Sequence, residues 1–192
     1  MKQITKKWNT ESKRPVILLD YDDVLFGFLG TVLKWYNREK KTSLKVQDVT
    51  SWDLSEIGDI HTFMKIIHNA DLWKEIPAKG NSMKVVQRLI NDGRWNIYIC
   101  TSCTTLQEYV VKTEVIEKSL PGFDISKVLN VSRKEIIRGD VLIDDKLENL
   151  IRCKPYMECI LMDMPHNQQT EAFRRINTLE ELPSILEDMF CY

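Results

Sequence analysis

The stretch that decides the fold is residues 16–25, VILLDYDDVL. Its four leading apolar residues predict a strand that is buried on both faces, as in a parallel sheet. The apolar run ends at three carboxylates, Asp20, Asp22 and Asp23, which repel one another when they are crowded. A fold that keeps them together at one strand end needs a compensating cation.

A second stretch with the same pattern lies far downstream, at residues 141–145, VLIDD. It is again an apolar strand that ends in paired acids, Asp144 and Asp145. In an open parallel sheet the carboxyl ends of the strands face one crevice, so we expect both acid clusters to meet there. Such an oxygen-rich site suits a hard divalent ion, and the sequence therefore predicts bound Mg²⁺.

The order of apolar patterns predicts the fold class. Strands are expected over residues 16–19, 95–100, 128–131, 141–144 and 159–162, and helical patterns alternate with the last four. This order predicts an α/β fold, a doubly wound, Rossmann-like core with a five-stranded parallel sheet. Residues 27–80 are richer in helix and aromatic side chains than a connector needs. We therefore expect a core domain of residues 1–26 and 81–192, and a small helical cap of residues 27–80 after the first strand.

Two helices of the core have clear sequence signals. One is capped by Asn81 or Ser82 and stopped by Gly93. The other is a long helix capped by Thr104 or Thr105. Its apolar pattern predicts that five residues face inward: Leu106, Tyr109, Val110, Thr113 and Ile116.

Composition narrows the function classes. The net charge is −1, so no excess positive field favours binding of a nucleic-acid polymer. The first fifteen residues lack an apolar signal region, and no stretch approaches the roughly 20 apolar residues of a membrane span. We expect no membrane partner and a cytoplasmic location. The five cysteines are scattered and odd in number, which does not indicate a disulfide framework.

The acids at the strand ends fit phosphoryl transfer, which needs a nucleophile, a proton donor and groups that bind phosphoryl oxygens. Asp20 can supply the nucleophile and form an aspartyl phosphate. Asp22 can protonate the departing alkoxide and then take a proton from the attacking water. Thr101 and Ser102 end a neighbouring strand and offer donors to the phosphoryl oxygens, and Lys134, or Arg133 beside it, offers positive charge. Asp144 would complete the Mg²⁺ site, with Asp145 a ligand through water.

These elements, in this order, resemble the haloacid dehalogenase (HAD) superfamily of phosphohydrolases. The pattern comprises Asp20-Tyr21-Asp22, a strand that ends at Thr101-Ser102, Lys134, and the pair Asp144-Asp145. Residues 99–102, ICTS, the lysine ten residues before Asp144, and the His166-Asn167-Gln168 loop are similar to the pyrimidine 5′(3′)-deoxyribonucleotidase family (cytosolic type C 5′-nucleotidases).

The resemblance implies further roles. It implies Mg²⁺ ligands at Asp20, the backbone carbonyl of Asp22, and Asp144. It also implies that aromatic side chains of the cap hold a nucleobase, and the candidates are Phe28, Trp52 and Trp73. The expected enzyme is a 5′-nucleotidase-type phosphomonoesterase that hydrolyses deoxyribonucleoside monophosphates to nucleoside and phosphate. Family members are often dimers, so a homodimer is among the expected states.

Two positions depart from that family, and two other functions stay open. The family commonly has glycine at the position of Asp23 and often has proline at that of Cys103. One alternative is a HAD phosphatase for another small phosphate monoester, such as a sugar phosphate. The other is a receiver-like signalling module that accepts phosphate on aspartate. In such a module, however, the lysine would follow the acids, whereas Lys134 precedes Asp144.

Overall fold

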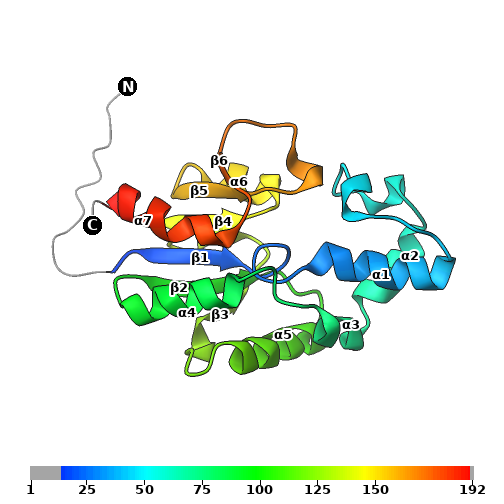
Figure 1. Ribbon diagram of the computed structural model, residues 1–192, viewed down its shortest axis with the longest axis horizontal. Helices are drawn as coiled ribbons and strands as arrows, with labels where there is room; N and C mark the ends of the chain where they lie inside the picture. Colours follow the sequence, from blue (N-terminus) through cyan, green and yellow to red (C-terminus); the bar gives the residue numbers. More distant parts are fainter. Residues whose placement is uncertain (1–13, 191–192) are drawn as a thin grey trace.

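The computed structural model describes residues 14–190 and contains one six-stranded sheet in which every paired strand is parallel (Figure 1). The strand order is β3-β2-β1-β4-β5-β6. Residues 1–13, where the sequence lacks an apolar signal region, lie outside the described residues, and so does Cys191. The other four cysteines are free thiols.

The strands are β1 Val16–Asp20, β2 Asn96–Thr101, β3 Val128–Asn130, β4 Val141–Asp144, β5 Glu158–Met162 and β6 Arg174–Ile176. The α-helices are α1 Phe28–Lys40, α2 Ile60–Ile67, α3 Ala70–Glu75, α4 Ser82–Asp92, α5 Leu106–Ser119, α6 Leu147–Cys153 and α7 Leu182–Phe190. Short 3₁₀ turns lie between them, and the ones used below are Lys134–Ile136 and Pro165–Asn167.

The predicted α/β doubly wound class is confirmed, but the strand count of five is wrong. The sixth strand, β6, has three residues and pairs with β5 at the sheet edge. Two of its residues are arginines, and only Ile176 is buried. An edge strand this short has no apolar run, so sequence periodicity gives no signal for it.

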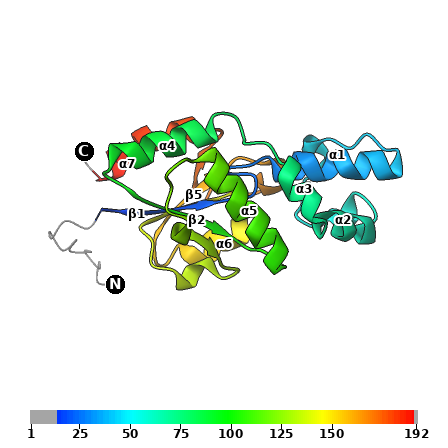
Figure 2. The ribbon, with the colours of Figure 1, turned by 90° about the horizontal axis from the view of Figure 1, so that it is seen from below.

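Helices cover both faces of the sheet. Alternate residues of β1 point to opposite faces, so Ile17 and Leu19 join the larger core cluster, whereas Leu18 joins a second one. The larger cluster includes Leu89 of α4 and Leu186 of α7, two helices that lie together on one face in Figure 2. The second cluster includes Leu150 of α6, on the other face.

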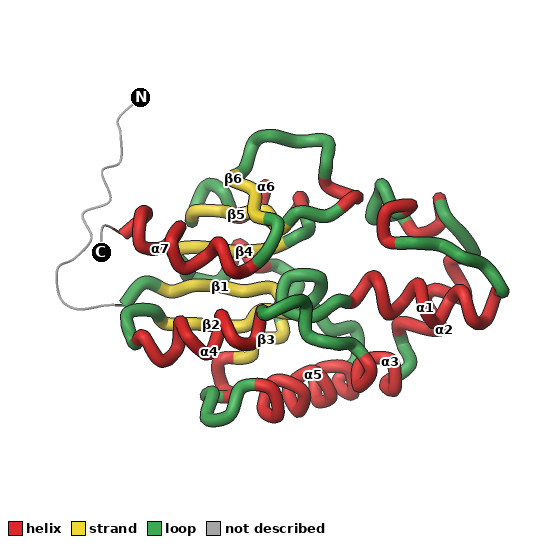
Figure 3. The backbone as a smooth tube through the Cα atoms, in the orientation of Figure 1, coloured by secondary structure: helices red, strands yellow, loops and turns green. Residues whose placement is uncertain are grey.

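The segment between β1 and α4 contains helices and loops but no strand (Figure 3). Its helices α1, α2 and α3 lie beyond the carboxyl end of β1, on the side to which its arrow points (Figure 1). The two connections to this segment run side by side, because Phe26 forms an antiparallel bridge with Ala78 and Gly27 N–H donates to Pro77 O at 2.9 Å. The division into a core and a cap at residues 26/27 and 80/81 stays a prediction.

Helix α5 does not bury the face that its apolar pattern predicts. Leu106 is 77% exposed and Val110 is 44% exposed. The buried residues are Glu108, Val111, Lys112 and Ile116. Of the predicted inward residues only Ile116 is buried, because the buried face of the helix carries the Lys112–Glu108 ion pair beside Val111 and Ile116.

The structure explains the acid at the position where the family commonly has glycine. Asp23 has φ +53°, in the left-handed region that glycine adopts without strain. Its buried carboxylate accepts a bifurcated hydrogen bond from Leu29 N–H, with N···O distances of 3.0 and 3.2 Å, and so satisfies a free donor in the first turn of α1. Burial raises the pKa of this carboxyl, and the nearby Asp145 adds to the shift.

The strain at Asp23 leads to a stability prediction. Asp23→Gly and Asp23→Ala both remove the carboxylate, but only alanine keeps a Cβ at φ +53°. We expect the glycine variant to have a free energy of unfolding about 1 kcal/mol larger than the alanine variant. Urea unfolding of the two proteins measures this difference. Equal stabilities would show that the turn relaxes out of the left-handed region.

Among the helices of residues 14–190, none is long and apolar enough to cross a membrane.

Candidate active site

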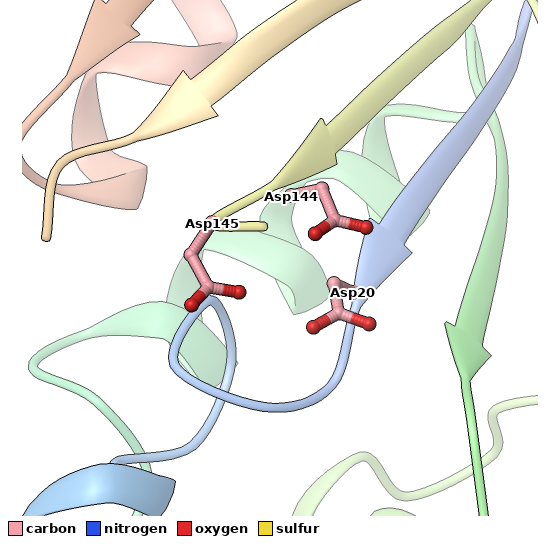
Figure 4. A group of neighbouring side chains, drawn as sticks. All are labelled: Asp20, Asp144 and Asp145. Atoms are coloured by element: carbon pink, nitrogen blue, oxygen red, sulfur yellow. The ribbon is translucent and has the colours of Figure 1, made fainter. Parts of the chain in front are cut away.

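Lys134 joins the two acid clusters that the sequence places at the strand ends. Asp20 is the last residue of β1 and Asp144 the last of β4, and these strands are neighbours. The Lys134 ammonium donates to Asp20 Oδ1 and, at 2.6 Å, to Asp144 Oδ2. All three side chains are buried. Figure 4 shows the carboxylates of Asp20 and Asp144 close together at the tips of their strands.

Neighbouring groups fix the carboxylate of Asp144. Its Oδ1 accepts from Lys146 N–H at 2.8 Å, and its Oδ2 accepts from Asn149 Nδ2 at 3.0 Å. Both donors come from the start of α6, so the helix that follows β4 orients the acid that ends it. Asn149 has no counterpart in the sequence motifs and was not predicted.

Asp145 faces the loop after β5. His166 Nε2 lies 3.1 Å from Asp145 Oδ2, and Asn167 Nδ2 donates to the Asp145 carbonyl at 2.8 Å. His166 is only 3% exposed. It is therefore a buried neighbour of the acid cluster. The sequence indicated only that His166 belongs to a loop, and not that it contacts Asp145.

Burial and mutual repulsion perturb these acids. Burial raises the pKa of Asp20 well above its ordinary value, and Asp144 adds to the shift while Lys134 opposes it. Burial likewise raises the pKa of Asp145, and His166 opposes this. Burial alone would lower the pKa of Lys134, but the carboxylates of Asp144 and Asp20 outweigh it and raise that pKa. One lysine thus balances more than one buried carboxylate.

The acid cluster suits a hard divalent cation. Asp20, Asp144 and Asp145 each offer an oxygen, and these atoms lie within 4.8 Å of one another. Asp145 Oδ2 is buried and is not hydrogen-bonded within residues 14–190, although His166 Nε2 lies 3.1 Å away. A buried, under-satisfied carboxylate oxygen beside two others is a donor set that Mg²⁺ or a similar ion would complete.

Asp22 and Thr101 meet at a second lysine. Lys112 Nζ donates to Asp22 Oδ2 at 2.6 Å and to Thr101 Oγ1 at 2.9 Å, and it lies 3.1 Å from Glu108 Oε1. Burial raises the pKa of Asp22, and Lys112 opposes the shift. Thr101 is buried at the end of β2, whereas Ser102, the next residue, is exposed. Each of the two candidate catalytic acids is therefore paired with a different lysine, Asp20 with Lys134 and Asp22 with Lys112.

The three aromatic candidates do not gather in one place. Phe28 and Trp73 are buried and stack on each other, with ring centroids 5.2 Å apart. Trp52 is half-buried and lies against His166, with 4.5 Å between ring centroids. A cavity of about 330 Å³ lies beside Trp52 and His166 and is also lined by Thr50 and Glu148.

Sequence reasoning thus identified residues that the structure brings together, and it missed others. Asp20, Lys134, Asp144 and Asp145 form one cluster. Lys112 and its partner Glu108 were not predicted, because the apolar pattern of α5 points elsewhere. The spacing does offer one signal. Lys112 lies four residues before Ile116, which is predicted to face inward, so the two side chains share one face of the helix, and that face is buried.

Known proteins are similar to this chain along most of its length. The model of the family described as "5′ nucleotidase, deoxy (Pyrimidine), cytosolic type C protein" matches residues 14–189. The 5′(3′)-deoxyribonucleotidase of Bacillus subtilis strain 168 is 26% identical over 170 residues, which cover 88% of this chain and 96% of that protein. The 5′(3′)-deoxyribonucleotidase of Bacillus phage SPbeta matches with the same identity and coverage.

Solved structures show the same fold. A haloacid dehalogenase-like hydrolase of Burkholderia xenovorans superposes with a TM-score of 0.62 at 13% identity, covering 93% of this chain and 99% of the other. A HAD hydrolase of Bacillus subtilis that was crystallised with magnesium superposes with a TM-score of 0.56 at 13% identity, covering 92% and 100%. At these identities the likeness concerns the fold.

Proposed function

Because the chain belongs to the cytosolic type C family of deoxy (pyrimidine) 5′-nucleotidases, and is therefore a phosphomonoester hydrolase, we propose that it hydrolyses deoxyribonucleoside monophosphates in a Mg²⁺-dependent reaction. The observation that carries the proposal is the Lys134 ammonium between Asp20 and Asp144, with Asp145 beside them. Burying more acids than cations destabilises a fold, so such a cluster indicates a functional role rather than a structural one. Its position at the carboxyl edge of a parallel sheet is where ligands bind in folds of this class.

The metal would be held by the residues that the resemblance implies. These are the carboxylates of Asp20 and Asp144 and the backbone carbonyl of Asp22, with Asp145 reaching it through water. When bound, Mg²⁺ supplies positive charge that offsets the repulsion between a carboxylate nucleophile and a phosphate dianion. The bond-forming, bond-breaking and proton-transfer steps of the proposed reaction are carried out by side chains of the protein.

Asp20 acts as the nucleophile. Its carboxylate forms a bond to phosphorus as the bond from phosphorus to the nucleoside oxygen breaks, which gives an aspartyl phosphate. Asp22 donates its proton to the departing oxygen, so the nucleoside leaves as an alcohol. In the second half, Asp22 takes a proton from water as that water attacks phosphorus. This step releases phosphate and restores the Asp20 carboxylate.

Lys134, Thr101 and Ser102 bind the phosphoryl oxygens in this scheme. Lys134 already lies against the nucleophile, so its charge is in place before the substrate arrives. Groups held in advance at the reacting centre need no reorganisation when charge develops there. Ser102 is exposed just past β2, where its hydroxyl and backbone N–H can reach a ligand in the crevice.

The helical cap, residues 27–80, would hold the base and limit access of water. Of its three aromatic candidates, Trp52 is half-buried and borders a cavity, whereas Phe28 and Trp73 are buried and stack on each other. Trp52 is therefore the best placed of them to stack on a base, a contact that contributes roughly 1–3 kcal/mol. Phe28 and Trp73 would shape the cap from inside. A homodimer and a cytoplasmic location stay predictions.

Phosphate release from a panel of substrates tests this function. The panel holds deoxyribonucleoside and ribonucleoside monophosphates and sugar phosphates, each assayed with Mg²⁺ and with a chelator. We expect a deoxyribonucleoside monophosphate to give the highest kcat/KM, and the chelator to remove activity that added Mg²⁺ restores. Faster hydrolysis of a sugar phosphate would favour the alternative phosphatase. Stable phosphoprotein without turnover would favour the receiver-like module.

A further inference from the structure

Lys112 is a buried cation that the proposed chemistry leaves without a role. It lies in the middle of α5 and is 0% exposed. Three oxygens surround its ammonium: Asp22 Oδ2 at 2.6 Å, Thr101 Oγ1 at 2.9 Å and Glu108 Oε1 at 3.1 Å. An ammonium has three N–H donors, so these acceptors use all of them. Lys112 therefore acts on its neighbours rather than on the substrate.

The first effect is on Asp22, the proposed general acid. Lys112 occupies Oδ2 of its carboxylate, while Oδ1 is buried and has no hydrogen-bond partner within the described chain. Buried polar atoms are seldom left unpaired, and one in a catalytic acid indicates a place for a substrate atom. The lysine thus distinguishes the two oxygens and leaves Oδ1 to exchange the proton with the leaving group.

The second effect is on Thr101, the proposed phosphate ligand. Its hydroxyl oxygen accepts from Lys112, and Cys103 Sγ lies 3.9 Å from the same oxygen. A hydroxyl has one hydrogen to give and two lone pairs to receive. Because Lys112 is donor only, the Thr101 hydrogen must be given elsewhere, and a phosphoryl oxygen in the crevice is an acceptor for it.

The surroundings of Lys112 hold it in this position. Its Nζ lies 4.1 Å from the ring centroid of Trp73, in α3, and 4.9 Å from that of Tyr21. Glu108 is itself anchored, because its Oε2 accepts from Thr104 N–H and from the Thr104 hydroxyl. The cation is thus shielded from water by two aromatic faces and tied to the start of α5.

We propose that Lys112 is a positioning residue, which assigns one oxygen of Asp22 to proton transfer and directs the Thr101 hydroxyl at the phosphoryl group. The inference rests on the proposed phosphatase function. It concerns the departure of the leaving group, because that is the step in which Asp22 donates its proton.

The test compares two leaving groups. A nucleoside alkoxide needs a proton to leave, whereas p-nitrophenolate leaves without one, so loss of general-acid catalysis slows the first far more than the second. The comparison uses kcat/KM, which reports the steps up to departure of the leaving group and not the later attack of water that both substrates share. We expect Lys112→Met to lower kcat/KM about 10²-fold with the best nucleotide of the panel, and less than about tenfold with p-nitrophenyl phosphate. Asp22→Asn, which removes the acid itself, sets the reference for this selective loss.

Matched variants keep the test decisive if Lys112→Met folds poorly. The double variant Lys112→Met/Glu108→Gln removes one positive and one negative charge together and is expected to show the same selectivity. Lys112→Gln retains amide donors toward Asp22 and Thr101 and is expected to recover most of the lost nucleotide turnover. Lys118→Met, an exposed lysine of the same helix, is expected to leave both rates unchanged.

The outcomes separate the two claims. If the wild-type protein hydrolyses neither substrate, the proposed function fails. If the wild-type protein is active but the Lys112 variants lower kcat/KM equally for both substrates, Lys112 only supports the fold and the inference is overturned. A Lys112→Gln variant as slow as the methionine variants would equally contradict the hydrogen-bond argument.

Discussion

The Asp20→Asn variant is expected to lose at least about 10⁴-fold in kcat while it keeps its fold, because an amide cannot form the bond to phosphorus that the Asp20 carboxylate is proposed to form. Asparagine has nearly the same shape as aspartate, and its carbonyl oxygen can still accept from Lys134. The change therefore removes the nucleophile and one negative charge but little packing.

Stability should move in the opposite direction to activity. Burial raises the pKa of Asp20, and the charges of Asp144, Asp22 and Asp145 nearby raise it further. Removing one charge from such a cluster relieves repulsion, so in a chelator the variant should unfold at the same or a higher urea concentration than the wild type. Asp188→Asn, at an exposed position, is the control and should change neither property. An active Asp20→Asn enzyme would refute covalent catalysis.

Lys134→Met is the change with the largest expected effect on stability. It leaves Asp20 and Asp144 buried without the cation that joins them. Breaking a buried ion pair by removal of one partner costs about 3–5 kcal/mol, so urea unfolding in a chelator should show a loss of that size. Activity should fall as well, because the same ammonium is proposed to bind the phosphoryl oxygens.

Two variants test the cause of that loss. Arg133→Met removes the adjacent basic residue, whose side chain is 72% exposed and pairs with Glu135, and it should change stability little. Lys134→Met/Asp144→Asn removes one of the stranded carboxylates and should recover part of the stability. If Lys134→Met were as stable as the wild type, the two acids would not depend on this lysine for compensation.

The acid cluster could be predicted because parallel-sheet geometry leaves little freedom. Two apolar strands that end in acids must bring Asp20 and Asp144 to one edge once the strands are neighbours, and β1 and β4 are. Lys134 follows from the resemblance rather than from geometry, since its 3₁₀ turn has no distinctive pattern. The sixth strand was missed because three residues with two arginines carry no apolar periodicity.

The second lysine shows where pattern reasoning fails. Period counting assumes that helices bury apolar side chains, yet α5 exposes Leu106 and buries Lys112. The cation is stabilised there by Asp22 and Glu108, and Asp22 comes from the loop after β1. A contact between residues 90 positions apart is invisible to a local window. The prediction for the aromatic candidates has a related weakness. An aromatic residue type indicates that the ring stacks on something, but it does not indicate whether that is a nucleobase or another side chain.

The most direct test of the account is to trap the phosphorylated enzyme. The wild-type protein is mixed with Mg²⁺ and its best nucleotide, quenched in acid within one turnover and reduced with borohydride, which converts an aspartyl phosphate to homoserine. We predict that mass spectrometry of the peptides finds homoserine at position 20 and that the Asp20→Asn protein shows none. Full phosphate release with no modification at Asp20, or with modification at another residue, would contradict the account.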